Sequence, residues 1–291
     1  MAKKQGLLER LQNGFVLGDG GYLMELRLRG FLEKESMTPE VVAKHPEEVQ
    51  RITQEFKDAG AEVLQTLTFF GTSNMLERAG FGERAEEINR TACRIARQIA
   101  GEEALVAGNL NSPSIYQDYD PSDSASQERT RAWLQEQLPW IVDEKVDFLI
   151  LETFSWLDEA LVALEVVRDV GLPIVATVSM EEKEGKTLDG FAADECARRM
   201  VEAGADVVGV NCLWGPDKML DYAVAMRQAV EVPVCCQPSA WHSWWSPGDP
   251  VPPLRFAQFV KEAMREDIRF LGACCGAGPE HIEAMAQAMV S

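Results

Sequence analysis

The sequence has few basic residues for its length, and this shortage excludes several classes of protein. Lys and Arg number 28 against 47 Asp and Glu, which gives a formal net charge of -19 over 291 residues. A nucleic-acid-binding protein needs a basic face, and an anionic membrane surface would repel this chain. No apolar run approaches the roughly 18–20 residues of a membrane span, and no apolar segment follows the early lysines as in a signal peptide. We therefore expect a cytoplasmic protein that binds neither nucleic acid nor membranes.

Histidine and paired cysteine motifs are also scarce. The chain has 3 His and 7 Cys, and no two cysteines are spaced as Cys-x-x-Cys. An odd number of cysteines in a chain of this length does not indicate a disulfide framework. We interpret His45, His242 and His281 as structural, because two fall in helical stretches and one in a loop. No pattern resembles a Ser-His-Asp triad, and no lysine follows a predicted strand closely enough to suggest Schiff-base chemistry.

The regular feature of the sequence is an alternation of short β-rich runs with amphipathic helices. Hydrophobic residues make up 46% and charged residues 26%, which is typical of a globular protein. Several of the runs are continuously apolar, as in strands buried on both faces of a parallel sheet. The eight predicted strands are Phe15–Asp19, Val63–Phe69, Ala104–Asn109, Phe148–Glu152, Ile174–Val178, Val207–Cys212, Val234–Gln237 and Ile268–Cys274.

Eight such strand–helix units without a break in composition predict a single (β/α)8 TIM barrel over residues 1–291. A doubly wound open sheet is the alternative. The barrel is favoured because the count reaches eight and no glycine-rich phosphate loop follows the first strand. One helix is expected from the Thr38-Pro39-Glu40 start to Gly60. Two long connections, Asn111–Ser126 and Ser239–Pro253, follow strands and should lie on the face where barrels place their active sites.

Chemically useful residues stand where the predicted strands end. Asp19 and Glu152 end strands one and four, and Cys212, Cys274 and Cys275 end strands six and eight. Three thiolates at one rim are a plausible zinc set with a fourth position open. Adjacent strand residues point to opposite faces, so the Cys-Cys pair can share an ion only if the strand ends there. From spacing alone, a zinc site and a group of ordinary buried thiols both remain open.

The remaining candidates divide between packing and function. Cys93 and Cys196 fall within helices and are expected to pack in the core, as are Cys235 and Cys236. The glycines after Asp19 allow a close backbone approach to a ligand. Aromatic residues at or beyond strand ends form either a hydrophobic lid or a surround for a methylated cation. These aromatics are Phe69, Phe70, Phe154, Trp156, Trp214, Trp241, Trp244 and Trp245.

Six stretches of the chain resemble the zinc-dependent homocysteine S-methyltransferases, and most closely the betaine-dependent members. They occur in the family's order and extend over about Gly14–Met289. The single cysteine followed far downstream by Cys-Cys-Gly is the most specific of them. The stretches are Gly18–Gly21, Gln65–Phe69, Asp147–Glu152, Gly209–Cys212, Gln237-Pro238 and Gly272–Gly276.

The resemblance implies a (β/α)8 barrel whose zinc ligands are Cys212, Cys274 and Cys275, with the substrate thiol as the fourth ligand. A free thiol has a pKa near 8.5 and reacts poorly at neutral pH, and zinc binding would deprotonate it. By the same resemblance, Glu152 would pair with the ammonium group of L-homocysteine. The Asp19-Gly20-Gly21 segment would receive the carboxylate. Thr66, Phe69 and Phe70 belong to the substrate-binding region.

The chain departs from the betaine-dependent enzymes around the methyl donor. It has Met37, Phe70 and Thr153 where those enzymes have a tryptophan and two tyrosines, so the resemblance implies a thinner aromatic cage. The chain ends near Ser291 without their C-terminal oligomerisation arm, so any homo-oligomer is expected to form without it. We expect a small onium donor: a betaine, S-methylmethionine or another sulfonium. The alternatives are a methyl group taken from a corrinoid partner protein, and a zinc-binding protein without catalysis.

Overall fold

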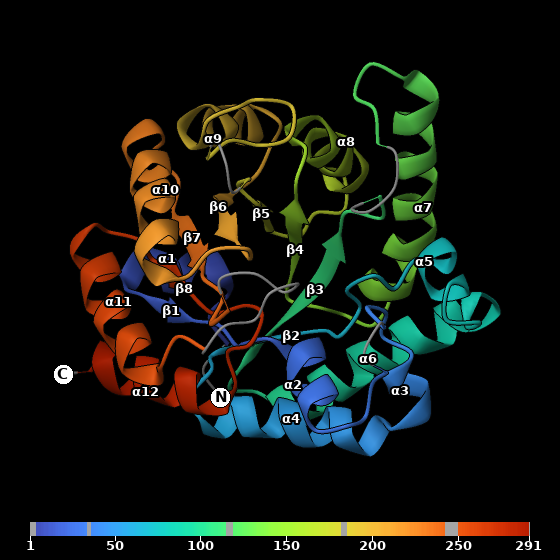
Figure 1. Ribbon diagram of the computed structural model, residues 1–291, viewed down its shortest axis with the longest axis horizontal. Helices are drawn as coiled ribbons and strands as arrows, with labels where there is room; N and C mark the ends of the chain where they lie inside the picture. The colour runs from blue at the N-terminus through green and yellow to red at the C-terminus, as the bar shows by residue number, and fades with distance from the viewer. Residues whose placement is uncertain (1–3, 34–35, 115–118, 182–184, 242–249, 291) are drawn as a thin grey trace.

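The computed structural model describes residues 4–33, 36–114, 119–181, 185–241 and 250–290, and its centre is one eight-stranded parallel sheet (Figure 1). The strand order is β1-β8-β7-β6-β5-β4-β3-β2, in which β2 to β8 pair in sequence order and β1 pairs with β8. The strands are β1 Val16–Leu17, β2 Val63–Gln65, β3 Leu105–Asn111, β4 Phe148–Phe154, β5 Ile174–Val178, β6 Val207–Asn211, β7 Val234–Gln237 and β8 Phe270–Leu271.

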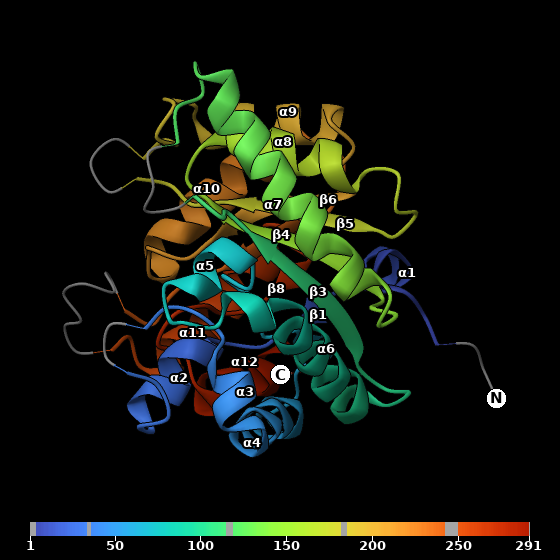
Figure 2. The same cartoon turned by 90° about the vertical axis from the view of Figure 1, so that its right-hand side faces the viewer.

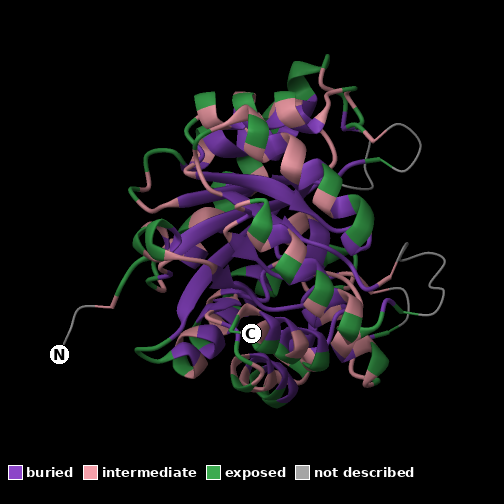
Figure 3. Cartoon of the chain, turned by 90° about the vertical axis from the view of Figure 1, so that its left-hand side faces the viewer, coloured by how far each residue is buried: buried purple, intermediate pink, exposed green. Residues whose placement is uncertain are grey.

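Helices surround this sheet, so the predicted (β/α)8 barrel is confirmed and the open doubly wound sheet is wrong. In Figure 3 the buried strands lie at the centre and the exposed residues lie on the outer faces of the helices. Among the described residues, none of the helices is both long and apolar enough to cross a membrane. The helices are α1 Leu7–Asn13, α2 Tyr22–Leu28, α3 Val41–Lys44, α4 Pro46–Asp58, α5 Ser73–Glu77, α6 Ala85–Ala100, α7 Ser124–Val142, α8 Leu157–Val167, α9 Ala193–Glu202, α10 Pro216–Ala229, α11 Pro253–Arg265 and α12 Pro279–Met289, with a 3-10 turn at Gly82–Arg84.

The barrel closes between β1 and β2 through a mixture of backbone and side-chain bonds. The Glu62 N–H donates to the Leu17 carbonyl at 2.8 Å, and the Leu17 N–H donates to the Glu62 carboxylate at 3.3 Å. Further along, the Gln65 N–H donates to Oδ2 of the buried Asp19 at 2.7 Å. A carboxylate therefore completes the seam where the regular strand ladder stops.

Small and apolar side chains fill the inside of the barrel, and α1 covers the end where the strands begin. Leu7 and Leu11 of this helix are buried in the same cluster as Phe148, Phe270 and Cys235 from the strands. Figure 2 shows α1 at the right-hand side of the barrel, away from α2 and α5. With this end plugged, the opposite end, where the strands finish, is left for ligand binding.

Several element boundaries differ from the sequence-based expectations. The first and eighth strands are shorter than predicted, at Val16–Leu17 and Phe270–Leu271 instead of Phe15–Asp19 and Ile268–Cys274. The single helix expected from Thr38 to Gly60 is wrong, because it is divided into α3 and α4 by Pro46, whose ring is compatible only with a helix start. The second strand ends at Gln65 rather than Phe69, since a tight turn follows in which the Thr68 N–H donates to the Thr66 carbonyl at 2.8 Å. The chain turns back there, and this sets the directions of Phe69 and Phe70.

Candidate active site and metal centre

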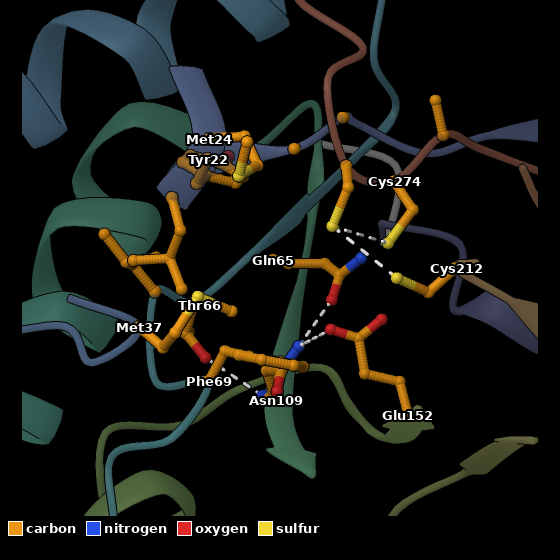
Figure 4. Close-up of a pocket in the computed structure, with 16 residues that line it drawn as sticks. Tyr22, Met24, Met37, Gln65, Thr66, Phe69, Asn109, Glu152, Cys212 and Cys274 are labelled. Atoms are coloured by element: carbon orange, nitrogen blue, oxygen red, sulfur yellow. Dashed lines mark hydrogen bonds between the residues drawn. The ribbon is translucent and has the colours of Figure 1, made fainter. Parts of the chain in front are cut away.

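The carboxyl ends of β2, β3, β4, β6 and β8 meet around one cavity (Figure 4). Thiol and carboxylate groups occupy one side of this cavity, and apolar side chains occupy the other. Its walls are formed by Gly20, Gly21, Tyr22, Leu23, Met24, Met37, Gln65, Thr66, Leu67, Phe69, Asn109, Glu152, Cys212, Ala273, Cys274 and Cys275.

The structure brings the three sequence-predicted cysteines together at this cavity. Sγ of Cys212 lies 3.5 Å from Sγ of Cys275, which lies 4.0 Å from Sγ of Cys274. All three sulfurs lie within 4.8 Å of one another, as the ligands of one metal ion must. Strand β8 ends at Leu271, so the two adjacent thiols are free of strand geometry and can face the same point.

Unusual backbone conformations hold the thiols in place. Cys212 follows β6 with a φ of 63° and Leu213 with a φ of 62°, both in the left-handed region. Gly276, with a φ of 78°, turns the chain directly after the cysteine pair. Left-handed conformations cost non-glycine residues free energy and persist where the surrounding structure imposes them. The turn after β6 is therefore locally strained, and this conformation places the Cys212 sulfur at the cavity.

The three thiols differ in pKa, so the negative charge resides mainly on one of them. The pKa of Cys212 lies well below the usual range because the thiols of Cys274 and Cys275 both lie within hydrogen-bonding reach of its sulfur. The pKa values of Cys274 and Cys275 are raised, chiefly by their interaction with the Cys212 thiolate. Soft, closely grouped sulfur donors of this kind suit a thiophilic cation.

Gly20 and Gly21 make room for the cysteine loop. A Cβ atom on Gly21 would lie 2.6 Å from the Cys274 carbonyl oxygen, and one on Gly20 would lie 2.4 Å from the Ala277 carbonyl oxygen. The Gly21 N–H also donates to the Ala277 carbonyl at 3.0 Å. Both glycines line the cavity, but the close backbone approach that they allow is made by the protein's own thiol loop.

Asp19 lies behind the cavity wall rather than in it. Its Oδ2 accepts hydrogen bonds from the Tyr22 hydroxyl at 2.8 Å and from the Gln65 N–H at 2.7 Å. Burial raises the pKa of Asp19 to about 7, and these two hydrogen bonds oppose the rise. The carboxylate therefore fixes the β1–β2 seam and the first turn of α2, which in turn positions the glycines.

Glu152 faces the thiols from β4 and is held by two asparagines. Its Oε1 accepts a hydrogen bond from Nδ2 of Asn109 at 2.5 Å, and its Oε2 accepts one from Nδ2 of Asn211 at 3.2 Å. Burial raises the pKa of Glu152 to about 8, the Asn109 bond opposes the rise, and the negative charges of Cys212 and Asp19 add to it. A cation next to Glu152 would relieve this cost and favour the ionised carboxylate.

Asn109 is a site residue that the sequence reasoning missed. Its Nδ2 also donates to Oε1 of Gln65 at 2.7 Å, so one amide joins residues of β2, β3 and β4. Its Oδ1 is buried and has no hydrogen-bond partner among the described residues. A buried acceptor without a donor is costly, so this oxygen is a natural contact for a ligand N–H group. The available signal was its place as the last residue of a predicted strand.

The apolar side of the cavity contains fewer aromatic rings than expected. Phe69 and Tyr22 line the cavity, whereas Phe70 has a φ of 52° and packs against Phe69 with ring centroids 4.4 Å apart. Phe70 is 1% exposed and is not among the residues that line the cavity, and its ring supports Phe69 from behind. Thr66 lines the cavity, and its hydroxyl accepts the Asn109 N–H at 3.0 Å.

The other aromatic candidates lie elsewhere or outside the described residues. Nε1 of Trp214 donates to the Met180 carbonyl at 2.7 Å, and this ring is not among those that line the cavity. Trp241 packs against Gly276, where an added Cβ would come within 3.0 Å of the indole. Trp244 and Trp245 lie outside the described residues, as does His242.

The other residues expected to pack in the core are buried and do not line the cavity. Cys93 and Cys196 lie in α6 and α9, and burial raises the pKa of each thiol to about 12. Cys235 and Cys236 are fully buried in β7. His281 is buried in α12, and its Nε2 lies 2.9 Å from the Val251 carbonyl, in keeping with a structural role.

Comparison with known proteins agrees with this arrangement of thiols and carboxylates. The family model for homocysteine S-methyltransferases matches residues 16–289. This chain belongs to the homocysteine S-methyltransferase family. It is therefore a methyltransferase, as its motifs indicated.

Relatives with different methyl donors resemble the chain to nearly the same degree. Betaine–homocysteine S-methyltransferase 1 of Danio rerio is 35% identical over 311 residues, which cover 99% of this chain and 76% of the relative. S-methylmethionine–homocysteine S-methyltransferase BHMT2 of Pongo abelii is 34% identical over 306 residues, covering 98% and 81%. Overall identity thus does not select between a betaine and a sulfonium as methyl donor.

A solved structure shares the fold. The metallated form of the homocysteine methyltransferase MmuM from Escherichia coli superposes with a TM-score of 0.77 at 19% identity. The match covers 96% of this chain and 99% of the other. At this identity the likeness concerns the barrel itself.

The fit between Gly21 and the cysteine loop predicts a strong effect of one added methyl group. Gly21→Ala should destabilise the protein by about 1–3 kcal/mol, because the Cys274 carbonyl cannot move without displacing the thiols. Gly6→Ala is the matched control, since Gly6 also precedes a helix and has no atom within 4 Å of an added Cβ. Urea unfolding of both variants measures the difference. Equal stability of the two would show that the loop yields freely.

Proposed function

We propose that the protein transfers a methyl group from a small onium donor to the thiol of L-homocysteine, producing methionine, with zinc bound by Cys212, Cys274 and Cys275. The observation that supports this most directly is the shared cavity, which places three thiols beside a buried Glu152 carboxylate. The thiols suit a metal and a sulfur substrate, and the carboxylate suits the ammonium group of an amino acid.

The dimensions of the cluster are compatible with zinc. A tetrahedral site with Zn–S bonds of about 2.3 Å separates its sulfurs by about 3.8 Å. The Sγ–Sγ distances of 3.5 Å (Cys212–Cys275) and 4.0 Å (Cys274–Cys275) lie on either side of this value. When bound, zinc supplies a Lewis acid that keeps the homocysteine sulfur deprotonated and nucleophilic at neutral pH.

The polar side of the cavity accounts for recognition of homocysteine. Glu152 offers a carboxylate to the substrate ammonium, and Oδ1 of Asn109 offers a second acceptor next to it. The Gly21 N–H already donates to Ala277, so the Gly20 N–H is the donor that we assign to the substrate carboxylate. These contacts fix the amino-acid end of homocysteine and leave its sulfur directed to the three cysteines.

The apolar side of the cavity accounts for the donor. Phe69 presents a ring that can attract a cation, worth about 0.5–2 kcal/mol, and Met24 and Met37 present polarisable sulfurs. The homocysteine sulfur forms a bond to the donor methyl carbon as the methyl–nitrogen or methyl–sulfur bond breaks. The bonding pair stays with the donor, which leaves as a neutral amine or thioether.

A panel of methyl donors tests the proposed function. Zinc-loaded protein should form methionine from homocysteine with betaine, S-methylmethionine or dimethylsulfoniopropionate, because each carries a positively charged leaving group. Methionine formation is followed by mass spectrometry with a methyl-labelled donor. Turnover with a methylated corrinoid protein, and with none of the onium donors, would contradict the proposal. Zinc binding without turnover on any donor would indicate a non-catalytic zinc protein.

Removing one thiol should remove the metal. We expect about one zinc per chain in the native protein and almost none in Cys275→Ala, because two remaining thiolates form an incomplete site. Metal content after dialysis is measured by mass spectrometry together with methionine formation. Cys93→Ala is the control, since Cys93 is a buried thiol in α6 outside the cluster. Full zinc content in Cys275→Ala would rule out the three-cysteine site.

Replacing the carboxylate should impair recognition of the amino group specifically. Glu152→Gln should lower kcat/KM for homocysteine by about 100-fold or more, since an ammonium then lacks its buried partner. Zinc content should remain unchanged, because the thiols are untouched. The thiol 4-mercaptobutanoate lacks the amino group, so its kcat/KM should differ little between the native protein and Glu152→Gln. Equal losses for the two thiols would remove Glu152 from ammonium binding.

A further inference from the structure

We propose that Arg27 binds the carboxylate of the methyl donor, so that the protein is selective for onium compounds that also carry a carboxylate. This inference rests on the proposed function and adds a second, anionic end to the donor site. It arises from the surroundings of a guanidinium that lies just behind the apolar wall of the cavity.

Arg27 contacts the two methionines of that wall from behind. It lies in the last turn of α2, and its Nη1 is 3.4 Å from Sδ of Met24, while its Nη2 is 3.2 Å from Sδ of Met37. Both methionines line the cavity. Figure 4 shows them on the side opposite Cys212 and Glu152. The guanidinium is therefore separated from the cavity by two thioethers.

The positive charge of Arg27 is poorly satisfied where it stands. A guanidinium offers five N–H donors, and thioether sulfurs are weak acceptors. The one oxygen that Arg27 contacts among the described residues is the Ser36 carbonyl, and its Nε is buried without a partner. In the described part of the chain, no carboxylate forms an ion pair with it within 4.0 Å. A partly buried guanidinium lacking an anion favours binding of one.

Two buried or partly buried acidic residues of the same region have other partners. Glu25, one turn earlier in α2, pairs with Arg29 at 2.8 Å. Glu40 is buried and accepts hydrogen bonds from the hydroxyls of Ser36 at 2.5 Å and Thr38 at 2.6 Å. Neither carboxylate pairs with Arg27, and the candidate active site lies on the other side of the two methionines that Arg27 contacts.

Methionine is a side chain that can give a ligand access to Arg27. It is unbranched with three rotatable bonds, so the two thioethers can move apart at low cost. A carboxylate entering between them would meet the planar face of N–H groups that recognises carboxylates with two parallel bonds. The same sulfurs would then lie against the donor's methylated centre.

The charges on the two sides of the cavity orient such a donor. The three cysteines and Glu152 stand on the side where the methyl group is accepted, and Arg27 attracts the carboxylate end from the opposite side. In betaine and dimethylsulfoniopropionate, one or two methylene groups separate these ends. A zwitterion bound in this direction presents its methyl groups to the thiols, which is the direction that the transfer requires. A cation without a carboxylate lacks this preference.

Pairs of donors with and without a carboxylate test the inference. In Arg27→Gln, the KM for betaine and for dimethylsulfoniopropionate should rise about 10- to 100-fold, since charged hydrogen bonds are lost. Activity with trimethylsulfonium and tetramethylammonium, which have no carboxylate, should change less than about two-fold. Arg29→Gln is the matched control, because Arg29 lies on the same helix and pairs with Glu25 and Glu55 away from the cavity.

The outcomes separate the carboxylate site from a structural role and from the proposed function. Equal losses for both kinds of donor would assign Arg27 a role in folding the loop through Ser36, and would overturn the inference. A loss of homocysteine affinity with unchanged donor affinity would assign Arg27 to the other substrate, and would equally overturn it.

A binding measurement keeps the inference testable without turnover. If none of the donors reacts, the proposed function fails, and calorimetry with N,N-dimethylglycine still reports on Arg27. Binding of this carboxylated amine to the native chain, with about a 10-fold or greater loss in Arg27→Gln, would support the site. Equal affinity for the native chain and the variant, or no binding to either, would overturn it.

Discussion

The buried Asp19 carboxylate joins β1 to β2, and the arrangement of the cavity depends on this seam. The same oxygen that accepts the Gln65 N–H also holds the Tyr22 hydroxyl at the start of α2. From Gln65 the polar contacts continue through Asn109 to Glu152 and then to Asn211. Four strands of the barrel are thereby joined across the mouth by side chains whose polar atoms face inward. Because the interior of the barrel is filled below this level, the network also forms the floor of the ligand cavity.

The two sides of the cavity solve different electrostatic problems. On one side, negative groups are crowded together: Glu152 has its pKa raised by burial and by Cys212, whose own thiolate is stabilised by two neighbouring thiols. On the other side, Arg27 is cationic and short of acceptors. Each side alone is unfavourable, and ligands of complementary charge relieve both. An amino-acid ammonium and an onium cation suit the negative side, whereas a carboxylate suits the positive side. A ligand that satisfies these charged groups therefore binds with a more favourable free energy.

Sequence patterns revealed the frame and the thiols, whereas contacts between distant residues required the structure. The apolar runs predicted as strands at Phe148–Glu152 and Val207–Cys212 are buried strands in the structure. The cysteines at the predicted ends of strands six and eight are visible directly in the sequence. The role of Asn109 depends on strand register, which sets β3 against β4 so that Asn111 lies opposite Glu152. The burial of Phe70 depends on a left-handed residue after a strand that ends early. The end of a predicted strand marked Asn109 as a candidate but not its partners, and no local pattern indicated the burial of Phe70. The contacts of Arg27 with Met24 and Met37 join a helix to a separate loop.

Methionines in the donor wall change what the site can select. A cage of aromatic rings attracts a methylated cation from all sides and responds to the cation alone. Here two rings, Phe69 and Tyr22, line the cavity beside Met24 and Met37, and the thioethers attract the cation less than further rings would. Thioethers compensate by their mobility and polarisability, and they leave a path to the guanidinium behind them. Selectivity then depends on the pair of charges in the donor and on the distance between them. A site with fewer aromatic rings can still fix the orientation of its donor. A donor with both a cation and a carboxylate is held at two ends, whereas a simple cation is held at one end and can rotate.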